Sequence, residues 1–288
     1  GFEILVIDNA PPDDGTKRAV AGFPGVRYAV EKLAGLDFAR NRAWREAGGD
    51  WVAYLDDDAT VDSGWFDGLQ AAWRENPGAG AVTGLVLPLE LSTSAQVLFE
   101  RRGGFRRGFD PLVFGRALPE NRFYPCGAGM FGSGCNMAFR REVLERLNGF
   151  DEALDTGAPL PGGGDLDIYY RVIRAGHVLV YEPRFLVFHE HRKSESALRQ
   201  QYYTWGLGMS AYVRKNMKAD PEMAGLFRHF LLWWIRHLLR ELRQSLRTGQ
   251  PLPPGMLIAE ICGCAVGWFG EYERSQRRSQ RIREAADE

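Results

Sequence analysis

Apolar runs alternate with segments of helical period along the chain through about residue 90. The short apolar runs predict strands at 2–8, 26–30, 51–55 and 80–87, and the segments between them predict helices at 36–47 and 64–76. Strands that alternate with helices in this way are typical of βαβ units, whose strands run parallel. We therefore expect an α/β fold in which a mostly parallel, Rossmann-like sheet is flanked by helices.

The rest of the chain lacks this regular alternation. Residues 101–134 are rich in Gly, Arg and aromatic residues without a clear period, which predicts a long functional loop or lid. Further helices are predicted at 141–147 and 165–175, short strands at 178–181 and 185–188, and helices from residue 192 to the end. We divide the chain into an α/β domain, 1–215, and a C-terminal helical extension, 216–288. Because the chain opens directly on a strand, we expect that an N-terminal strand of the domain is missing from this sequence.

One predicted helix of the extension, 227–246, is strongly amphipathic. Its apolar side carries Phe227, Phe230, Leu231, Trp234, Ile235, Leu238 and Leu242, and its opposite side carries Arg236, Arg240, Arg243 and Arg247. One interpretation is a helix that packs on the domain and leaves a solvated basic face. The other is a helix that lies in an anionic membrane surface, where Trp and Arg side chains are well suited.

Composition and charge narrow the classes of partner and compartment. The 288 residues carry a formal net charge of −1, which gives no general attraction to nucleic acid. No apolar run of about 18 residues predicts a membrane span. The four cysteines match no zinc spacing and are too few for a disulfide framework: Cys126, Cys135, Cys262 and Cys264. We expect a cytoplasmic protein without a nucleic-acid partner, with peripheral contact at the inner face of the cell membrane.

Three consecutive carboxylates, Asp56, Asp57 and Asp58, directly follow the predicted strand 51–55. A buried strand does not accommodate adjacent acids, so they are expected at its carboxyl end, where open α/β sheets bind ligands. Mg²⁺ and Mn²⁺ are held by oxygen atoms, commonly by one or two carboxylates together with substrate phosphates. The acids therefore predict a site for a divalent metal and a phosphate. The alternative is an acidic turn that caps the next helix.

Four other segments, taken with these acids in order and spacing, resemble family 2 glycosyltransferases: 35–43, 132–141, 148–152 and 163–167. The resemblance covers roughly residues 2–215. It implies a GT-A fold and a metal-dependent, hexosyltransferase-type enzyme that uses Mn²⁺ or Mg²⁺. Such an enzyme moves a sugar from a nucleotide-diphosphate donor, with a UDP-sugar as first guess, to an acceptor hydroxyl with inversion. It further implies a glycan or lipid-linked acceptor in envelope or polysaccharide synthesis.

The resemblance also implies roles for single residues. Asp56 and Asp58 match the family's Asp-x-Asp motif, in which Asp58 binds the metal and Asp56 helps to hold the metal or the donor ribose. Asp8 matches an acid that meets the nucleotide base. Asp165 matches the general base, and His189 matches a histidine that completes the metal site. The alternative for Asp165 is a helix N-cap and for His189 a core histidine.

The remaining candidates are less sharply defined. Asp57, Arg40, Asn41, Gly134 and Asn136 are expected in the nucleotide-sugar site. Arg40 would reach the pyrophosphate or pair with the acids, and the segment with Gly134 and Asn136 would be a loop near the sugar or a plain turn. His191 competes with His189 as the metal ligand, and Asp167 is the nearby acidic alternative to Asp165. Relatives often carry an acid where this chain has Gly164.

Two rival functions use the same features differently. A nucleotidyltransferase that makes a nucleotide-sugar would need a Gly-rich, basic phosphate loop after the first strand, whereas residues 9–16 contain one glycine and are acidic. A non-enzymatic, membrane-docked scaffold of the same fold would have no need for the acids and the histidine. We therefore favour the glycosyltransferase.

Overall fold

The computed structural model describes residues 1–115, 120–157 and 159–287. The first part of the chain contains β1 (Ile4–Asn9), α1 (Gly15–Val20), β2 (Val26–Glu31), α2 (Leu36–Glu46), β3 (Trp51–Leu55), β4 (Ala59–Val61), α3 (Trp65–Glu75), β5 (Ala79–Pro88) and α4 (Ser94–Arg101). The predicted strands and helices are all present, and β4 and α4 were not among the predictions. The middle part follows with β6 (Leu112–Phe114), the 3₁₀ turn η1 (Ala128–Met130), β7 (Asn136–Arg140), α5 (Arg141–Arg146), α6 (Gly164–Arg174) and β8 (Val178–His189). The predicted lid contains only β6 and η1 among its described residues, and its residues 116–119 lie outside them.

The described strands form two sheets. β1 and β2 pair in parallel, and a six-stranded sheet has the order β3-β7-β5-β8-β4, with β6 also paired to β8. In this larger sheet β5 and β8 run parallel, whereas the β3–β7, β5–β7, β4–β8 and β6–β8 pairs are antiparallel. The α/β architecture is confirmed, but the expected mostly parallel pairing is wrong. β3 and β5 do share a direction, yet β7, from much later in the chain, lies between them and runs the opposite way.

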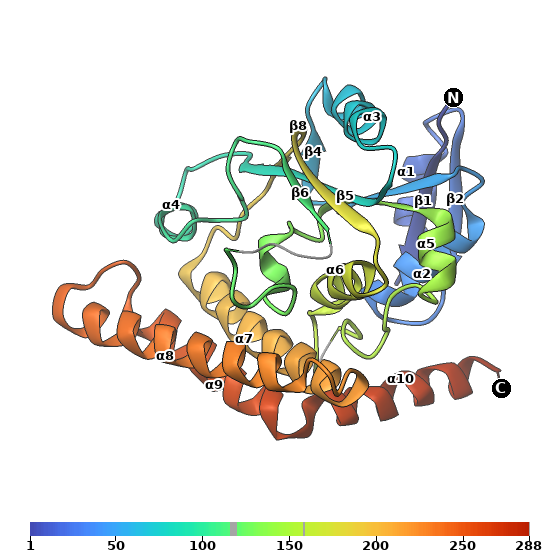
Figure 1. Ribbon diagram of the computed structural model, residues 1–288. Helices are drawn as coiled ribbons and strands as arrows, with labels where there is room; N and C mark the ends of the chain where they lie inside the picture. Colours follow the sequence, from blue (N-terminus) through green and yellow to red (C-terminus); the bar gives the residue numbers. More distant parts are fainter. Residues whose placement is uncertain (116–119, 158, 288) are drawn as a thin grey trace.

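Helices cover both faces of the larger sheet (Figure 1). Successive residues of a strand point to opposite faces. Accordingly Val82 and Val180 pack with Leu69 of α3, whereas Phe139 and Tyr181 join a cluster on the side of α6. Because helices cover both faces of the sheet, side chains on both sides of β5 and β8 are buried, and both strands are almost continuously apolar.

The C-terminal part consists of four consecutive helices joined by short connections: α7 (Glu195–Ala219), α8 (Ala224–Thr248), α9 (Pro254–Val266) and, after the π-helical kink η2 (Gly267–Glu271), α10 (Tyr272–Asp287). They lie together as a layer beneath α6 in Figure 1. α7 and α9 approach so closely that a Cβ on Gly206 would overlap the carbonyl oxygen of Glu260, and one on Gly263 would overlap that of Tyr203. Only glycine permits this backbone contact.

This extension is not a separate unit. The predicted boundary at residue 215 falls inside α7. Phe227, Phe230 and Leu231 of α8 are buried in the same cluster as Phe139 of the sheet, because the apolar side of α8 packs on the domain. The basic side of α8 is exposed, so the packing interpretation describes this helix. No described helix is both long and apolar enough to cross a membrane.

Candidate active site

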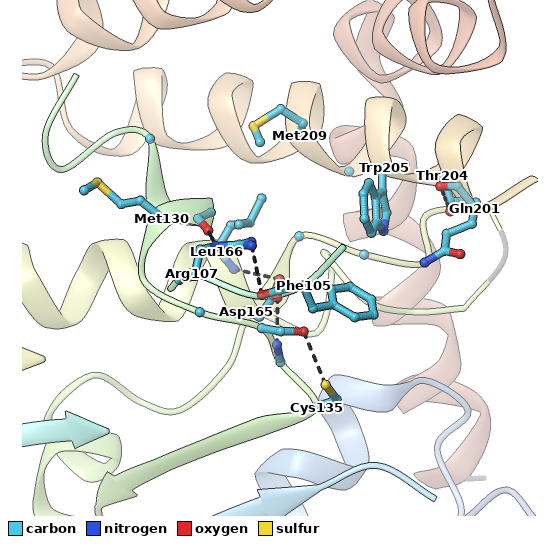
Figure 2. A pocket seen from close by; sticks show the side chains of 18 of the residues that line it. Phe105, Arg107, Met130, Cys135, Asp165, Leu166, Gln201, Thr204, Trp205 and Met209 are labelled. Atoms are coloured by element: carbon cyan, nitrogen blue, oxygen red, sulfur yellow. Dashed lines mark hydrogen bonds between the residues drawn. The ribbon is translucent and has the colours of Figure 1, made fainter. Parts of the chain in front are cut away.

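One cavity of about 1300 Å³ lies between the sheet and the helical extension. Its lining includes Arg40, Asp56, Asp58, Asp165 and His189, which come from four separate segments of the chain. Figure 2 shows Asp165 between Leu166 and Phe105, with Trp205 and Met209 projecting from α7 on the other side of the pocket. The volume exceeds the range of roughly 300–1,000 Å³ that is common for one small ligand. The cavity therefore has room for more than one ligand.

The three predicted acids follow β3 in a tight turn, in which the Ala59 N–H donates to the Asp56 carbonyl at 3.1 Å. Asp56 and Asp58 line the cavity. Asp57 between them is exposed and is absent from the lining, so its contacts give no support to the expected role in donor binding. Asp56 and Asp58 therefore contribute to the cavity, whereas Asp57 is exposed to solvent.

Asp58 lies next to His189. Pairing of β4 with β8 places Ala59 opposite His189, and the Glu190 N–H donates to the Asp58 carbonyl at 2.8 Å. The Asp58 Oδ1 and His189 Nε2 atoms are 3.3 Å apart. The hydrogen bond to His189 lowers the pKa of Asp58 below its usual value, so Asp58 is charged at neutral pH.

A chain of buried hydrogen bonds orients His189. His191 Nε2 lies 3.0 Å from Glu100 Oε1, and His191 Nδ1 lies 3.0 Å from His189 Nδ1. With His191 donating to the carboxylate, its Nδ1 is the acceptor for His189 Nδ1–H. The His189 Nε2 atom then faces Asp58, and a cation or a proton must lie between this nitrogen and the carboxylate. His191 is therefore placed behind His189 rather than at the metal position.

The residues present fit a hard divalent ion, although the described residues contain no three His, Cys, Asp or Glu side chains arranged to hold one alone. The oxygen of Asp58 and the nitrogen of His189 are acceptable ligands for Mn²⁺ or Mg²⁺. Asp56 instead lies 3.7 Å from the Arg40 guanidinium. Because these ions commonly take only one or two carboxylates and complete their shell with water and substrate phosphate, two protein ligands suffice.

Arg40 is the centre of an acidic cluster. Its guanidinium is 6% exposed and lies 3.0 Å from Asp37, 3.6 Å from Asp155 and 3.7 Å from Asp56. Of the two predicted roles, its contacts match pairing with the acids. Burial, aided by Asp165 and Asp56, raises the pKa of Asp155 to about 7 against the opposing effect of Arg40. Asp155 lines the cavity and no sequence motif had identified it.

Asp165 is the acid at the centre of the cavity. It is the second residue of α6, whose N-cap is Gly163, so Asp165 is not itself the cap. Its Oδ1 accepts the Leu166 N–H at 2.8 Å and its Oδ2 accepts the Gly134 N–H at 3.2 Å. These two donors fix the direction of the carboxylate at the N-terminal end of α6.

Two neighbouring acids have other partners. A Cβ on Gly164 would overlap the carboxylate of Asp37. The carboxylate of Asp37, from α2, therefore occupies the space that a side chain at position 164 would need. Asp37 is fully buried, and its Oδ2 has no hydrogen-bond partner among the described residues. Asp167 is turned away from the cavity and pairs with Arg171 at 2.6 Å and Lys215 at 2.5 Å. Its burial opposes ionisation, but the two cations hold its pKa at about 2.

Three other candidates lie outside the cavity lining. Asn41 bonds Phe150 through both its amide groups, and Asn136 donates to the carbonyl oxygens of Leu85 and Phe185. Their polar atoms are occupied by the fold, so their contacts indicate structural roles in place of the expected donor binding. Asp8 accepts the Tyr28 hydroxyl proton at 2.7 Å in the β1–β2 sheet. Gly134 does line the cavity, as expected.

Arg107 is a cavity residue that the sequence did not single out. Its Nε donates to the Gly129 carbonyl at 2.6 Å and its Nη1 to the Phe105 carbonyl at 2.9 Å. Within the described ranges it has no carboxylate partner at ion-pair distance, and burial lowers its pKa. It belongs to the Gly- and Arg-rich segment 101–134, whose composition indicated a functional loop without indicating which arginine faces the site.

Comparison with known proteins gives the family. The sequence model of glycosyl transferase family 2 matches residues 1–147, just over half of the 288 residues. The chain belongs to glycosyl transferase family 2. A glucosyl-dolichyl phosphate glucuronosyltransferase of Haloferax volcanii is 31% identical over 126 residues, 44% of this chain and 37% of the relative. A pre-mycofactocin glycosyltransferase of Mycobacterium tuberculosis is 27% identical over 272 residues, 91% of this chain and 52% of the relative. The chain spans about half, or less, of the length of these curated relatives.

Solved structures share the fold. The mannosyltransferase PcManGT from Pyrobaculum calidifontis, in complex with GDP-Man and Mn²⁺, has a TM-score of 0.53 at 20% identity, covering 99% of this chain and 76% of its own. Residues 1–349 of S. aureus TarS, in complex with UDP-GlcNAc, have a TM-score of 0.50 at 12% identity, covering 95% and 83%. The predicted family and GT-A fold are confirmed.

Proposed function

We propose that this member of the family is a glycosyltransferase that moves a sugar from a nucleotide-diphosphate donor to an acceptor hydroxyl. The observation that carries the proposal is the shared cavity, in which the Asp58–His189 pair and the Asp165 carboxylate line the same space. The donors and the metal named for the solved relatives of this fold agree with it. Asp58 and His189 would hold Mn²⁺ or Mg²⁺, and the bound ion would neutralise the charge of the leaving diphosphate.

Asp165 would act as the general base. The acceptor oxygen forms a bond to the anomeric carbon, the bond from that carbon to the diphosphate oxygen breaks, and its electron pair leaves with the nucleoside diphosphate. The acceptor proton passes to Asp165, whose direction is set by the Gly134 and Leu166 amides. A single displacement without an enzymic nucleophile inverts the configuration of the anomeric carbon.

Nucleotide binding tests the proposal directly. A panel of nucleoside diphosphates, with UDP first, would be scanned for Mn²⁺-dependent thermal stabilisation of the chain. We expect stabilisation by one nucleotide, a Tm rise that requires Mn²⁺, and its loss in Asp58→Ala at unchanged circular dichroism. If no nucleotide raises Tm, or if Asp58→Ala responds like the native chain, the assignment is wrong. The rival nucleotidyltransferase would instead need a phosphate loop, and residues 9–16 do not line the cavity.

We further propose that the protein acts at the cytoplasmic face of a membrane, on a glycan or lipid-linked acceptor of envelope or polysaccharide synthesis. The name of the Haloferax relative specifies a lipid-linked acceptor. Because the apolar side of α8 is buried, the contact would use its outer face, where Leu232, Leu239 and Leu246 are exposed at seven-residue spacing. Four exposed arginines lie among them: Arg236, Arg240, Arg243 and Arg247.

Vesicle flotation tests this contact. Each basic residue near an anionic surface contributes about 1 kcal/mol, and salt weakens the attraction. The chain should float with anionic vesicles at low salt, and a variant with Arg236, Arg240 and Arg243 changed to Glu should not. Neutral vesicles are the control. Equal flotation of both chains, or flotation of neither, would remove the proposed contact.

A further inference from the structure

The cavity has a second end that the proposed reaction does not use. α8 lines it with Phe230, Trp233 and Trp234, and the loop before η1 adds Phe123. The Phe123 ring centroid lies 5.6 Å from that of Phe230 and 5.1 Å from that of Trp233. These rings belong to the helical extension and to the loop that packs on it. Together Phe123, Phe230, Trp233 and Trp234 form an aromatic wall of the cavity.

The 3₁₀ turn η1 connects the aromatic wall to Asp165. A Cβ on Gly127 would lie 3.5 Å from Phe230 Cε2, and one on Gly129 would lie 3.8 Å from Leu166, the residue after Asp165. Since consecutive Cα atoms are about 3.8 Å apart, the Cα atoms of Gly127 and Gly129 are separated by no more than about 7.6 Å. The aromatic wall and Leu166 therefore both contact this one short turn, and an acceptor that touches the wall can extend to Asp165.

The chemistry of the wall selects the class of acceptor. Aromatic rings bind apolar and aromatic groups through their faces and edges, and they supply few hydrogen bonds. Among the described lining residues, the polar side chains that adjoin Phe123 in the chain come from one short stretch, 120–122, where the Arg122 guanidinium lies over the Phe123 ring at 4.7 Å. A glycan chain needs polar partners along its length, because each buried hydroxyl without one is costly.

We infer that the acceptor carries an apolar aglycone, aromatic or prenyl, which binds against Phe123, Phe230 and Trp233 while its hydroxyl meets Asp165. This inference rests on the proposed function and narrows it, since it excludes an acceptor that is only a glycan. The size of the cavity supports it, because about 1300 Å³ accommodates a donor and a second ligand together.

Acceptor probes that differ only in the aglycone test the inference. Methyl, 4-nitrophenyl and farnesyl β-D-glucosides would be titrated calorimetrically into the chain with UDP and Mn²⁺ present. We expect the 4-nitrophenyl or the farnesyl glucoside to bind at least tenfold more tightly than the methyl glucoside, and the tighter of the two identifies the source of the aglycone. Equal affinities for the three probes, or no binding of any, would overturn the inference.

Two variants locate the effect on the wall. Trp233→Ala and Phe123→Ala should each reduce the preference for the apolar aglycone at least fivefold, and Phe123→Ala provides the answer if Trp233→Ala does not fold. His229→Ala is the control on the same helix, since His229 is exposed and is not among the residues that line the cavity. A preference that survives in a folded wall variant places the aglycone elsewhere. UDP titrated in the same samples separates the two proposals, because loss of nucleotide binding would instead count against the glycosyltransferase.

Discussion

The hydrogen-bond chain behind His189 gives the sharpest test of the metal site, through the variant His191→Phe. His191 lies in an aromatic environment, with ring centroids 4.7 Å from Phe99 and 5.8 Å from Phe105. Phenylalanine keeps a ring of similar size in that space but cannot accept the proton of His189 Nδ1–H. The neutral ring of His189 can then carry its one proton on Nε2, and that proton would occupy the position of the metal beside Asp58.

The expected loss of Mn²⁺ affinity can be taken from other metal sites in which the hydrogen-bond partner of a ligand histidine was removed. Removing a hydrogen-bond partner of a metal-binding histidine typically lowers metal affinity 10- to 100-fold. This corresponds to about 1.4–2.7 kcal/mol. The Asp58 carboxylate is untouched by the change, so binding should weaken rather than disappear. His189→Ala, which removes the proposed ligand itself, should weaken Mn²⁺ binding further.

Electron paramagnetic resonance measures free Mn²⁺ directly, and the titration would be run with UDP present. His177→Phe is the matched control, because this histidine directly precedes β8, at the end away from His189, and is not among the residues that line the cavity. We expect native affinity in His177→Phe and a Kd raised 10- to 100-fold in His191→Phe. If a folded His191→Phe chain binds Mn²⁺ within twofold of the native chain, the hydrogen-bond chain does not orient a metal ligand.

Three further outcomes are expected. Asp165→Asn should keep UDP binding and lower turnover by about 10² or more, with an inverted anomeric product by NMR; near-native turnover or retention would contradict the role of base. In the folded chain the pKa of Asp155 is about 7, above its ordinary value of 3.8. Its ionisation therefore destabilises the folded state as the pH rises from about 4 to about 7. Tm should fall between pH 4 and pH 7, and Asp155→Asn should flatten the fall and be more stable at pH 8; an unchanged slope would contradict this. Asp167→Asn should lower the free energy of unfolding by about 3 kcal/mol in urea titrations, since Arg171 and Lys215 lose their fully buried partner while Lys215 keeps Asp151 at 3.0 Å; a loss under 1 kcal/mol would refute the argument.

Local chemistry made part of the site predictable. Asp56 and Asp58 follow an apolar strand, and acids in that position have to leave the sheet at its edge. Asp165 and His189 were found through the resemblance, and the fold brings both to the cavity of these acids. Asn41 and Asn136 belonged to the same motifs, yet the fold buries both. A motif identifies a segment without telling which of its polar atoms face inward.

Other features depend on tertiary arrangement alone. Periodicity predicted β3 and β5 and their common direction, but no local signal placed β7 between them. Asp155 and Arg107 lie in the cavity because loops bring them there, and neither follows a recognisable pattern. The apolar side of α8 was compatible with either a membrane or protein, because periodicity shows that a face is apolar and not what covers it.

The ion pairs of Arg102 show which segments would have to be exchanged together to transfer the aromatic wall between related enzymes. It immediately follows α4 and pairs with Glu241 of α8 at 2.9 Å and with Glu260 of α9 at 2.5 Å, and the loop it begins carries Phe105 and Arg107 into the cavity. Grafting α8 alone would leave Arg102 without one of its acids and misplace the start of that loop. The smallest transferable cassette is therefore α8 and α9 together with residues 102–107 and the segment of Phe123, and chimeras built on this unit should retain donor binding while they change acceptor.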